Sequence, residues 1–322
     1  MKLHAINRVL TSYMGWYIML CCLVFTCHAQ ETQVHEVALN SDNDAYLFIS
    51  QDQYYTNGIA FSYRKLTNNH RLRGNAVKAL WGLSIGHKLY NAYNGFSEVE
   101  FMDRPFTAYL YMRGHTSKFY KNESVLNITA EIGVYGKAAF GEQMQRGFHR
   151  LFGFYQINGW DYQLKNNAVF DMRFGYNKLL ARSSSGKVDM QAGASVSLGL
   201  NQSYLGLGPI FRFGRVNALY ETAFYNNRLS ATKSSIKMER YFYYRPVIYY
   251  RLYDASIQGG MLLHDKGPVV FGIEPWMLSQ LIGFNYAKKQ FSLDIHLQFN
   301  TKEVRSTATA HQYGSITIGY AF

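Results

Sequence analysis

The sequence predicts an all-β protein, a closed antiparallel barrel of about twelve strands that spans a membrane. Segment 291–300 alternates strictly between apolar and polar residues, which is the period of a strand with one apolar face. The chain holds 27 Tyr and 22 Phe, and aromatic rings gather where a barrel meets the membrane–water interface. It also opens on an export-type segment and closes on an alternating strand that ends at Phe322. These features are typical of bacterial outer-membrane barrels.

Residues 1–29 read as a secretory signal peptide. Lys2 and Arg8 give the positive start, an apolar run covers 16–26, and Cys27-His28-Ala29 offers a cleavage site. A transmembrane anchor is the competing interpretation, but the apolar run is short. All three cysteines lie in this segment, so residues 30–322 are expected to form one disulfide-free domain.

The strand prediction follows the chain as twelve alternating segments, an even number as single-chain barrels of this type have. They are 36–50, 54–66, 79–91, 105–116, 123–137, 168–182, 186–200, 206–214, 238–255, 276–287, 290–300 and 312–322. In the clearest of them, the apolar set is expected to face lipid and the polar set the lumen; these are Phe291, Leu293, Ile295, Leu297 and Phe299 against Asp294 and His296.

Strand parity then divides the connections between two sides, because both ends of such a barrel lie in the periplasm. The outer side receives 51–53, 92–104, an insertion near 138–167, and 301–310. The short links 183–185 and 288–289 fall on the periplasmic side, as expected for tight turns. The stretch 215–237 also falls there, although its length does not suit a tight turn.

The charge of the chain is strongly positive, at +12 for the full sequence and +10 once Lys2 and Arg8 are removed. The basic residues are spread along the chain without blocks, and no nucleic-acid-binding motif accompanies them. We therefore expect an anionic partner and no nucleic acid.

The insertion 138–167 holds the first candidate functional residues. Gln145 and His149 are four residues apart, so one helical turn places both on the same face. A long ordered connection of this kind often carries function. The alternative for His149 is an ordinary histidine of a surface loop.

Three more polar clusters map near the predicted outer rim. The first, 40–44, is rich in amides and carboxylates, which are poor strand formers and are expected to face the lumen, where they can ligate a hard cation or simply line it. The second, 54–58, contains Asn57-Gly58 and can equally be a hairpin end. The third holds Arg104, which can bind a phosphate or carboxylate or pair with Asp103.

The order and spacing of these motifs resemble the LpxR-type lipid A 3-O-deacylases. The resemblance rests on short motifs spread over most of residues 30–322: Asp42-Asn43-Asp44, Tyr55-Thr56-Asn57-Gly58, Arg104-Pro105-Phe106-Thr107-Ala108, Gln145 with His149, Gly159-Trp160 with Gln163-Leu164, Thr301-Lys302-Glu303, and His311-Gln312-Tyr313-Gly314-Ser315. It implies a monomeric twelve-stranded outer-membrane barrel whose site lies near the outer leaflet.

The resemblance also implies an activity, hydrolysis of the ester-linked 3′-acyloxyacyl chain of lipid A with Ca²⁺ in the site. His149 would be the general base, with Gln145, Asn43, Asp44 and Thr56 in the site. Asn43 and Asp44 would hold Ca²⁺, and Arg104 and Asn57 would contact lipopolysaccharide. Such chemistry is coherent, since ester hydrolysis needs a base and a positive group at the oxyanion.

The sequence departs from the family pattern at three places. Phe106-Thr107-Ala108 stands where the family has Tyr-Ala-Gly, and Asp42 stands where it has Glu. No acidic residue follows His149 in the expected stretch, which holds Tyr155 and Gln156. These departures bear on substrate choice and on the cation site.

Two other functions remain open at this point. A barrel phospholipase would need a serine two residues after its histidine, where this chain has Leu151. A non-enzymatic pore or structural barrel explains the strands but has no use for Gln145 and His149 in an ordered insertion. Conductance and ester hydrolysis distinguish these alternatives.

Overall fold

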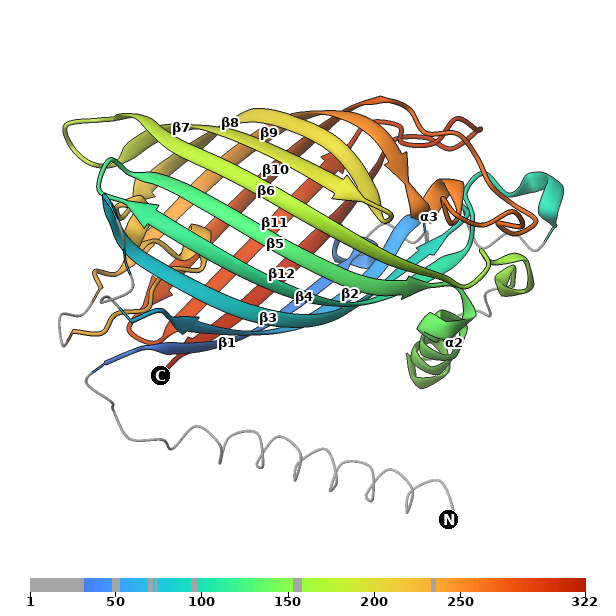
Figure 1. Cartoon of the computed structure of the whole chain (residues 1–322), viewed down its shortest axis with the longest axis horizontal. Coiled ribbons are helices and arrows are strands. Elements are labelled where there is room, and N and C mark those ends of the chain that lie inside the picture. The colour runs from blue at the N-terminus through green and yellow to red at the C-terminus, as the bar shows by residue number, and fades with distance from the viewer. Residues whose placement is uncertain are drawn as a thin grey trace, which may run out of the picture.

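The computed structural model describes residues 32–47, 53–68, 72, 74–93, 98–152, 158–232 and 236–322. The predicted signal peptide and the tight turn at 51–52 lie outside these ranges, as do Tyr155 and Gln156. In the described chain twelve antiparallel strands close into one barrel, with β1 hydrogen-bonded to both β2 and β12 (Figure 1). The predicted fold class is therefore confirmed.

Every predicted strand has an observed counterpart. The strands are β1 (His35–Asn43), β2 (Tyr54–Leu66), β3 (Ala76–Asn91), β4 (Thr107–Tyr120), β5 (Ser124–Tyr135), β6 (Asn167–Arg182), β7 (Val188–Gly199), β8 (Gln202–Arg215), β9 (Glu239–Asp254), β10 (Trp276–Lys288), β11 (Phe291–Asn300) and β12 (His311–Ala321). None of the helices in the described ranges is long and apolar enough to cross a membrane.

The alternation predicted for 291–300 holds in β11. Phe291, Ile295 and Leu297 are exposed on the outer wall. Asp294 faces the lumen, where it accepts hydrogen bonds from Tyr243 and Asn285. The strand thus shows an apolar face to lipid and a polar face to the barrel interior, as a membrane barrel requires.

The first strand is shorter than predicted. It ends at Asn43, and a 3₁₀ helix, η1 (Asp44–Leu47), stands where the strand was predicted to continue; residues 48–50 of that prediction lie outside the described ranges. The Asn43 side chain accepts a hydrogen bond from the backbone N–H of Ala45, at 2.7 Å. A side chain that bonds the backbone two residues on favours a turn over a strand, so the prediction of a strand was wrong for residues 44–47.

The two ends of the barrel differ in what they carry. The end that strand parity assigns to the outer side carries η1, η4 (Val99–Phe101), η5 (Lys137–Ala139), α2 (Gly141–Phe152), η6 (Trp160–Tyr162) and α3 (Ala255–Gln258). Figure 1 shows α2 and α3 at the same end of the barrel, and the turn between β6 and β7 at the other. The outer segment 255–275, with α3, was not anticipated from the sequence.

The long periplasmic connection between β8 and β9 folds back into the barrel. It contains η7 (Leu219–Glu221) and η8 (Ala223–Tyr225). Leu219 packs on the inner faces of β3, β4 and β5, and Leu229 packs against β2 and β12. The segment, 216–232 with 236–238, is therefore a luminal plug, and its packing explains why a connection of this length occurs on the short-turn side.

Hydrogen bonds to buried charged side chains of the strands hold the plug in place. The Arg212 guanidinium bonds both carboxylate oxygens of Asp189 and donates to Thr222 Oγ1 at 2.9 Å. Glu239 accepts from the same Thr222 hydroxyl and from the backbone N–H of Ala223. Buried charges are costly unless they are paired and hydrogen-bonded, and these groups satisfy one another.

Candidate functional site

A pocket of about 340 Å³ opens between α2 and the outer wall of β1, β2 and β3. His149 and Gln145 line it from α2, and Asn43, Thr56 and Asn57 line it from the barrel. The structure therefore brings together five of the residues predicted for the site, from three segments distant in sequence. The pocket lies on the membrane-facing side of the wall, because Leu39, Ile59 and Ile85 on the same strands are exposed there.

Alternation along β1 divides the 40–44 cluster between two sides. Asn40 and Asp42 face the lumen, where Asp42 accepts hydrogen bonds from Tyr55 and Ser315. Asn43 instead faces α2 with Ser41. The prediction that the whole cluster faces the lumen is thus wrong for Asn43, because successive side chains of a strand point to opposite faces.

A β-bulge in β2 aims Thr56 into the pocket. The pairing of β2 with β3 shifts register between Tyr55 and Asn57, so Thr56 is the extra residue. Strict alternation would turn one of two neighbours inward, but the bulge lets both Thr56 and Asn57 line the pocket. Thr56 is buried, and its hydroxyl has no hydrogen-bond partner among the described residues. Such an orphaned group is a marker of a ligand or water site.

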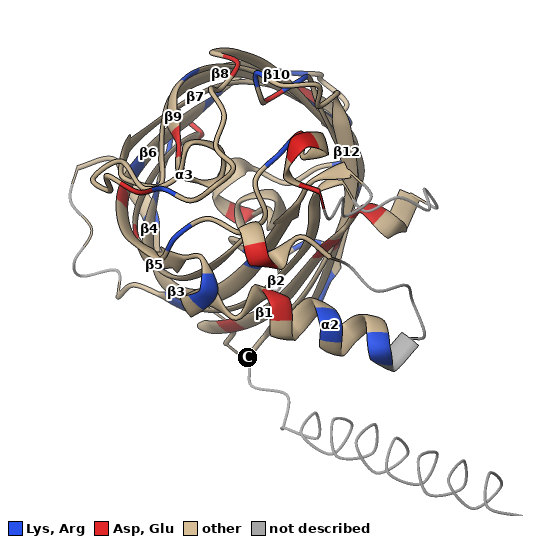
Figure 2. Cartoon of the chain, turned by 90° about the vertical axis from the view of Figure 1, so that its right-hand side faces the viewer, with Lys and Arg blue, Asp and Glu red and all other residues tan. Residues whose placement is uncertain are grey.

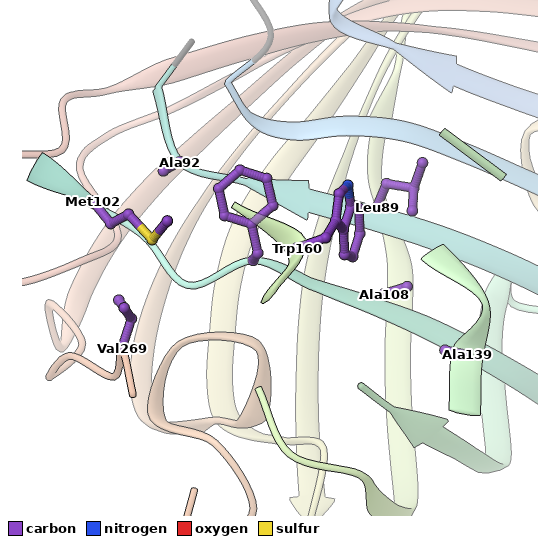
Figure 3. Close-up of a cluster of buried hydrophobic side chains, with 8 residues drawn as sticks. Leu89, Ala92, Met102, Ala108, Ala139, Trp160 and Val269 are labelled. Carbon is purple, nitrogen blue, oxygen red and sulfur yellow. The ribbon is translucent and has the colours of Figure 1, made fainter. Parts of the chain in front are cut away.

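A small apolar cluster fixes α2 to the barrel (Figure 3). Trp160 is 1% exposed and packs edge-on against Phe106, with ring centroids 5.5 Å apart. A Cβ at Gly141, the first residue of α2, would lie 2.4 Å from the Ala108 Cβ and 2.6 Å from the Trp160 ring. Glycine is therefore required where the helix begins, since any side chain would push α2 off the wall.

Trp160 also sets the orientation of Gln145. The indole Nε1 donates to Gln145 Oε1 at 2.8 Å, and both residues are buried. Because an indole N–H can only donate, the amide must offer its oxygen to Trp160 and its NH₂ group to the other side. Gln145 thus presents a fixed donor where it lines the pocket.

Among the described residues, His149 is the one imidazole that lines this pocket. It lies one helical turn beyond Gln145 on α2, as the four-residue spacing predicted, and is 9% exposed. A nearly buried imidazole beside a fixed amide donor and a threonine hydroxyl can take a proton from a water molecule while the amide holds a developing negative charge. This arrangement suits ester hydrolysis.

The oxygen atoms beside the pocket fit a hard cation in part. Asp44 is buried, and one of its oxygens accepts from the backbone N–H of Gln53 at 3.1 Å. Asp44 and the orphaned Thr56 hydroxyl supply oxygen donors of the kind that Ca²⁺ takes. Within the described ranges no group of three or more His, Cys, Asp or Glu side chains gathers around one point. An ion here would therefore need neutral oxygens, water or substrate to complete its shell.

Arg104 lies apart from this pocket, inside the barrel. Its guanidinium pairs with Glu303 at 3.2 Å and donates to Ser256 at 2.9 Å, and it stacks over the Tyr90 ring. The partner considered from sequence, Asp103, instead accepts from the Tyr54 hydroxyl at 2.7 Å. The structure therefore does not bring Arg104 together with His149.

The apolar half of the pocket was not predicted from sequence. Met144 and Phe148 of α2 face Tyr46 and Leu89 across it. Phe140, Met144 and Phe148 are exposed on one side of the insertion at intervals of four residues. That spacing was present in the sequence and is the signal that could have identified an apolar helix face.

The match to a family model decides the classification. The model described as "Outer membrane protein LpxR" matches residues 17–322. The chain belongs to the LpxR family. Among solved structures, LpxR from Salmonella typhimurium superposes with a TM-score of 0.72 at 17% identity, covering 89% of this chain and 100% of that one.

A second barrel is less similar. The β domain of the Bordetella autotransporter BrkA matches with a TM-score of 0.51 at 10% identity, covering 90% of this chain and 100% of that one. At such identities both likenesses show the fold alone. No individual curated protein sequence matches significantly. Family and fold together make this LpxR-family protein an outer-membrane β-barrel.

Proposed function

We propose that this LpxR-family protein is a lipid A deacylase that hydrolyses the ester-linked 3′-acyloxyacyl chain. The observation that carries the proposal is the convergence of His149, Gln145 and Thr56 on one pocket of the membrane-facing wall. Membership of the LpxR family supports the same activity. The pocket belongs to the outer end of the barrel, so the substrate is a lipid of the outer leaflet.

The position of the pocket suits a substrate that stays in the membrane. Met144 and Phe148 supply an apolar side that continues the lipid-facing surface of β1, β2 and β3. Figure 2 shows α2 outside the ring of strands. An acyl chain can therefore slide laterally between α2 and the wall without leaving an apolar environment, and its ester then reaches the polar end of the pocket.

The proposed chemistry uses four side chains. His149 accepts a proton from water as the water attacks the ester carbonyl, and then returns it to the leaving sugar oxygen. The Gln145 NH₂ group, fixed by Trp160, donates to the carbonyl oxygen as it becomes negative. The Thr56 hydroxyl and Asn57 line the same polar end, where they hold the water and the substrate.

Ca²⁺ is the cofactor we propose, held by Asp44 with Asn43 and Thr56 close by. When bound, it would add positive charge near the ester oxygen and supply Lewis acidity. Asn43 would bind the ion less strongly than Asp44, because its side-chain oxygen already accepts the Ala45 N–H. Asp44 supplies the negative charge of the site.

The pore alternative meets an obstacle in the lumen. The plug packs against strands on several sides of the barrel, and Arg212, Asp189 and Glu239 tie it down. A passive pore needs a wide, continuous aqueous path, and a segment packed against the inner faces of the strands narrows that path. The fold therefore favours an enzyme on the outer wall over a channel.

The test is His149→Ala in purified protein with lipid A as substrate and product mass as readout. Loss of a general base costs roughly 10²–10⁴-fold in rate, so the 3′-deacylated product should almost disappear. His264→Ala is the matched control, because His264 is exposed on the outer segment 255–275. A folded His149→Ala protein with the wild-type rate would refute the mechanism. If that variant fails to fold, His149→Gln replaces it.

A further inference from the structure

A second cavity, distinct from the α2 pocket, lies inside the outer end of the barrel. Its volume is about 180 Å³. Residues of β2, β3, β8, β9, β10, β11 and β12 line it, and Ser256 of α3 and Glu303 of the 301–310 connection lie at its edge. In the end-on view of Figure 2, α3 lies within the outline of the ring of strands.

Four charged side chains of this cavity neutralise one another. Arg104 pairs with Glu303, and Arg251 pairs with Asp254 at 2.6 Å. Asn300 also donates to Glu303. These contacts tie the 301–310 connection to β9 and β11. Because the four charged side chains are already paired, they have few hydrogen bonds left to offer a ligand.

Six other polar side chains face the cavity without a hydrogen bond to any described residue. Lys88 contacts the Tyr55 ring, with its Nζ 5.5 Å from the centroid, but the ammonium has no ion pair or hydrogen bond with any described residue. No described residue forms a hydrogen bond with the imidazole of His311. Four tyrosine hydroxyls also have no hydrogen-bond partner among the described residues; they belong to Tyr90, Tyr204, Tyr249 and Tyr313. None of these polar atoms is sealed off from the cavity.

The cavity deeper in the lumen provides a contrast. It is also polar, yet most of its side chains bond to protein. Ser62 bonds Ser84 at 2.9 Å, Ser117 donates to Asn127 at 2.6 Å, and Arg113 pairs with Glu131. A polar barrel interior therefore does not by itself leave an ammonium and several phenols unpaired. Of these two cavities, the outer one therefore has more polar groups without a hydrogen bond to a described residue.

The free groups define the chemistry of a ligand. An ammonium and phenol hydroxyls are chiefly hydrogen-bond donors, so they suit a group rich in acceptor oxygens. The lining carries three basic and two acidic side chains, which leaves one net positive charge before His311 is counted. Several tyrosine rings add flat apolar faces, and Tyr204 and Tyr249 meet edge to face at 5.2 Å. Anionic oxygens next to apolar ring faces match a sugar that carries a phosphate.

We infer that this luminal cavity is a binding site for a phosphorylated sugar, with Lys88 as the phosphate contact and the tyrosines around the sugar ring. The site does not depend on hydrolysis at His149, since no residue is shared with the α2 pocket. The sugar is either part of a cell-surface saccharide or a diffusible sugar phosphate, and both present the same chemistry.

Calorimetric titration of the purified full-length protein in detergent tests this site. Glucose 6-phosphate should bind, while glucose and inorganic phosphate should each bind more weakly. Lys88→Met should weaken binding by roughly ten- to a hundredfold, the usual effect of a hydrogen bond to a charged group. Tyr249→Phe keeps the ring and should weaken binding by roughly two- to tenfold. Lys118→Met, at an exposed lysine of β4, is the matched control and should bind normally.

Each outcome decides the question. A titration with phosphorylated oligosaccharide from deacylated lipopolysaccharide distinguishes the two sources, since the tighter of the two ligands identifies the source. Absence of binding by both ligands, or unchanged affinity in Lys88→Met and Tyr249→Phe, would overturn the proposal. Equal affinity for inorganic phosphate and glucose 6-phosphate would show an anion site without a sugar. If Lys88→Met does not fold, Tyr249→Phe carries the test.

Discussion

Trp160→Phe tests whether the Gln145 amide of the proposed active site is held in place by a single indole. The substitution keeps an aromatic ring against Phe106 but removes the Nε1–H that donates to Gln145 Oε1 at 2.8 Å. Gln145 is 4% exposed, so its oxygen would lose its partner without gaining water freely. Leaving a buried acceptor unsatisfied costs about 1–3 kcal/mol. If the amide instead turns away to find another partner, it no longer points its NH₂ group at the ester. A loss of about 1–3 kcal/mol of transition-state stabilisation would then lower the rate by roughly 5- to 150-fold.

The assay is the initial rate of lipid A deacylation in detergent, with heat-modifiable gel mobility as the measure of folding. Trp276→Phe is the control, because Trp276 lies exposed on the outer wall of β10. Trp160→Phe is then repeated in a Gln145→Ala background. Since Trp160 acts through Gln145, it should cause little further loss there. Wild-type activity in the single variant, or losses that multiply in the double variant, would refute this reasoning.

Three further predictions concern the cation, the lumen and the outer loop. Chelation with EGTA should abolish deacylation, and Asp44→Asn should raise the Ca²⁺ concentration needed for half-maximal rate; full activity in EGTA would exclude the cation. The protein should be silent in planar bilayers, whereas replacing 217–237 with a short Gly-Ser linker should produce conductance; equal conductance of both would contradict a sealing role for the plug. Burial opposes ionisation of Glu303, but His311, Arg251 and Arg104 together lower the pKa of Glu303 to about 2. A depressed folded-state pKa gives stability that is present above the ordinary value of 4.5 and is lost as pH falls toward 2. Pepsin cleavage within 301–310, normalised to denatured protein, should therefore increase over that window in wild type and not in Glu303→Gln.

The barrel was predictable because its signals are local and repeated. Strict alternation in β11 marks which residues meet lipid, and twelve such segments give an even, closable number. The end of β1 was not predictable from alternation. A single side-chain bond from Asn43 to the Ala45 N–H begins η1 and stops the strand. Boundaries of this kind depend on one hydrogen bond and leave no periodic trace.

The sequence grouped most of the candidate site residues correctly but did not predict which side of the wall they occupy. Motif order identified His149, Gln145, Asn43, Thr56 and Asn57, and the structure gathers all five at one pocket. Which side of the wall they occupy depends on alternation in β1 and on the one-residue bulge in β2, and a bulge has no clear sequence signature.

Arg104 shows that two residues predicted at the same rim of the barrel can lie on opposite sides of its wall. It lies at the same end of the barrel as His149 but inside the wall, paired with Glu303 across a separation of 199 residues. The plug poses a similar problem, since a long connection on the periplasmic side gives no sign that it folds inward. Both placements are set by long-range contacts between residues that a sequence pattern cannot pair.

We propose that this barrel removes an acyl chain from lipid A by means of His149. The most direct test of this proposal is the mass of lipid A isolated from cells that produce the full-length protein, compared with cells that produce His149→Ala at equal folded levels. We expect the wild-type protein to lower the lipid A mass by one 3′-acyloxyacyl chain and the variant to leave the mass unchanged. Identical lipid A from both cell types, intact or cleaved, would contradict this proposal.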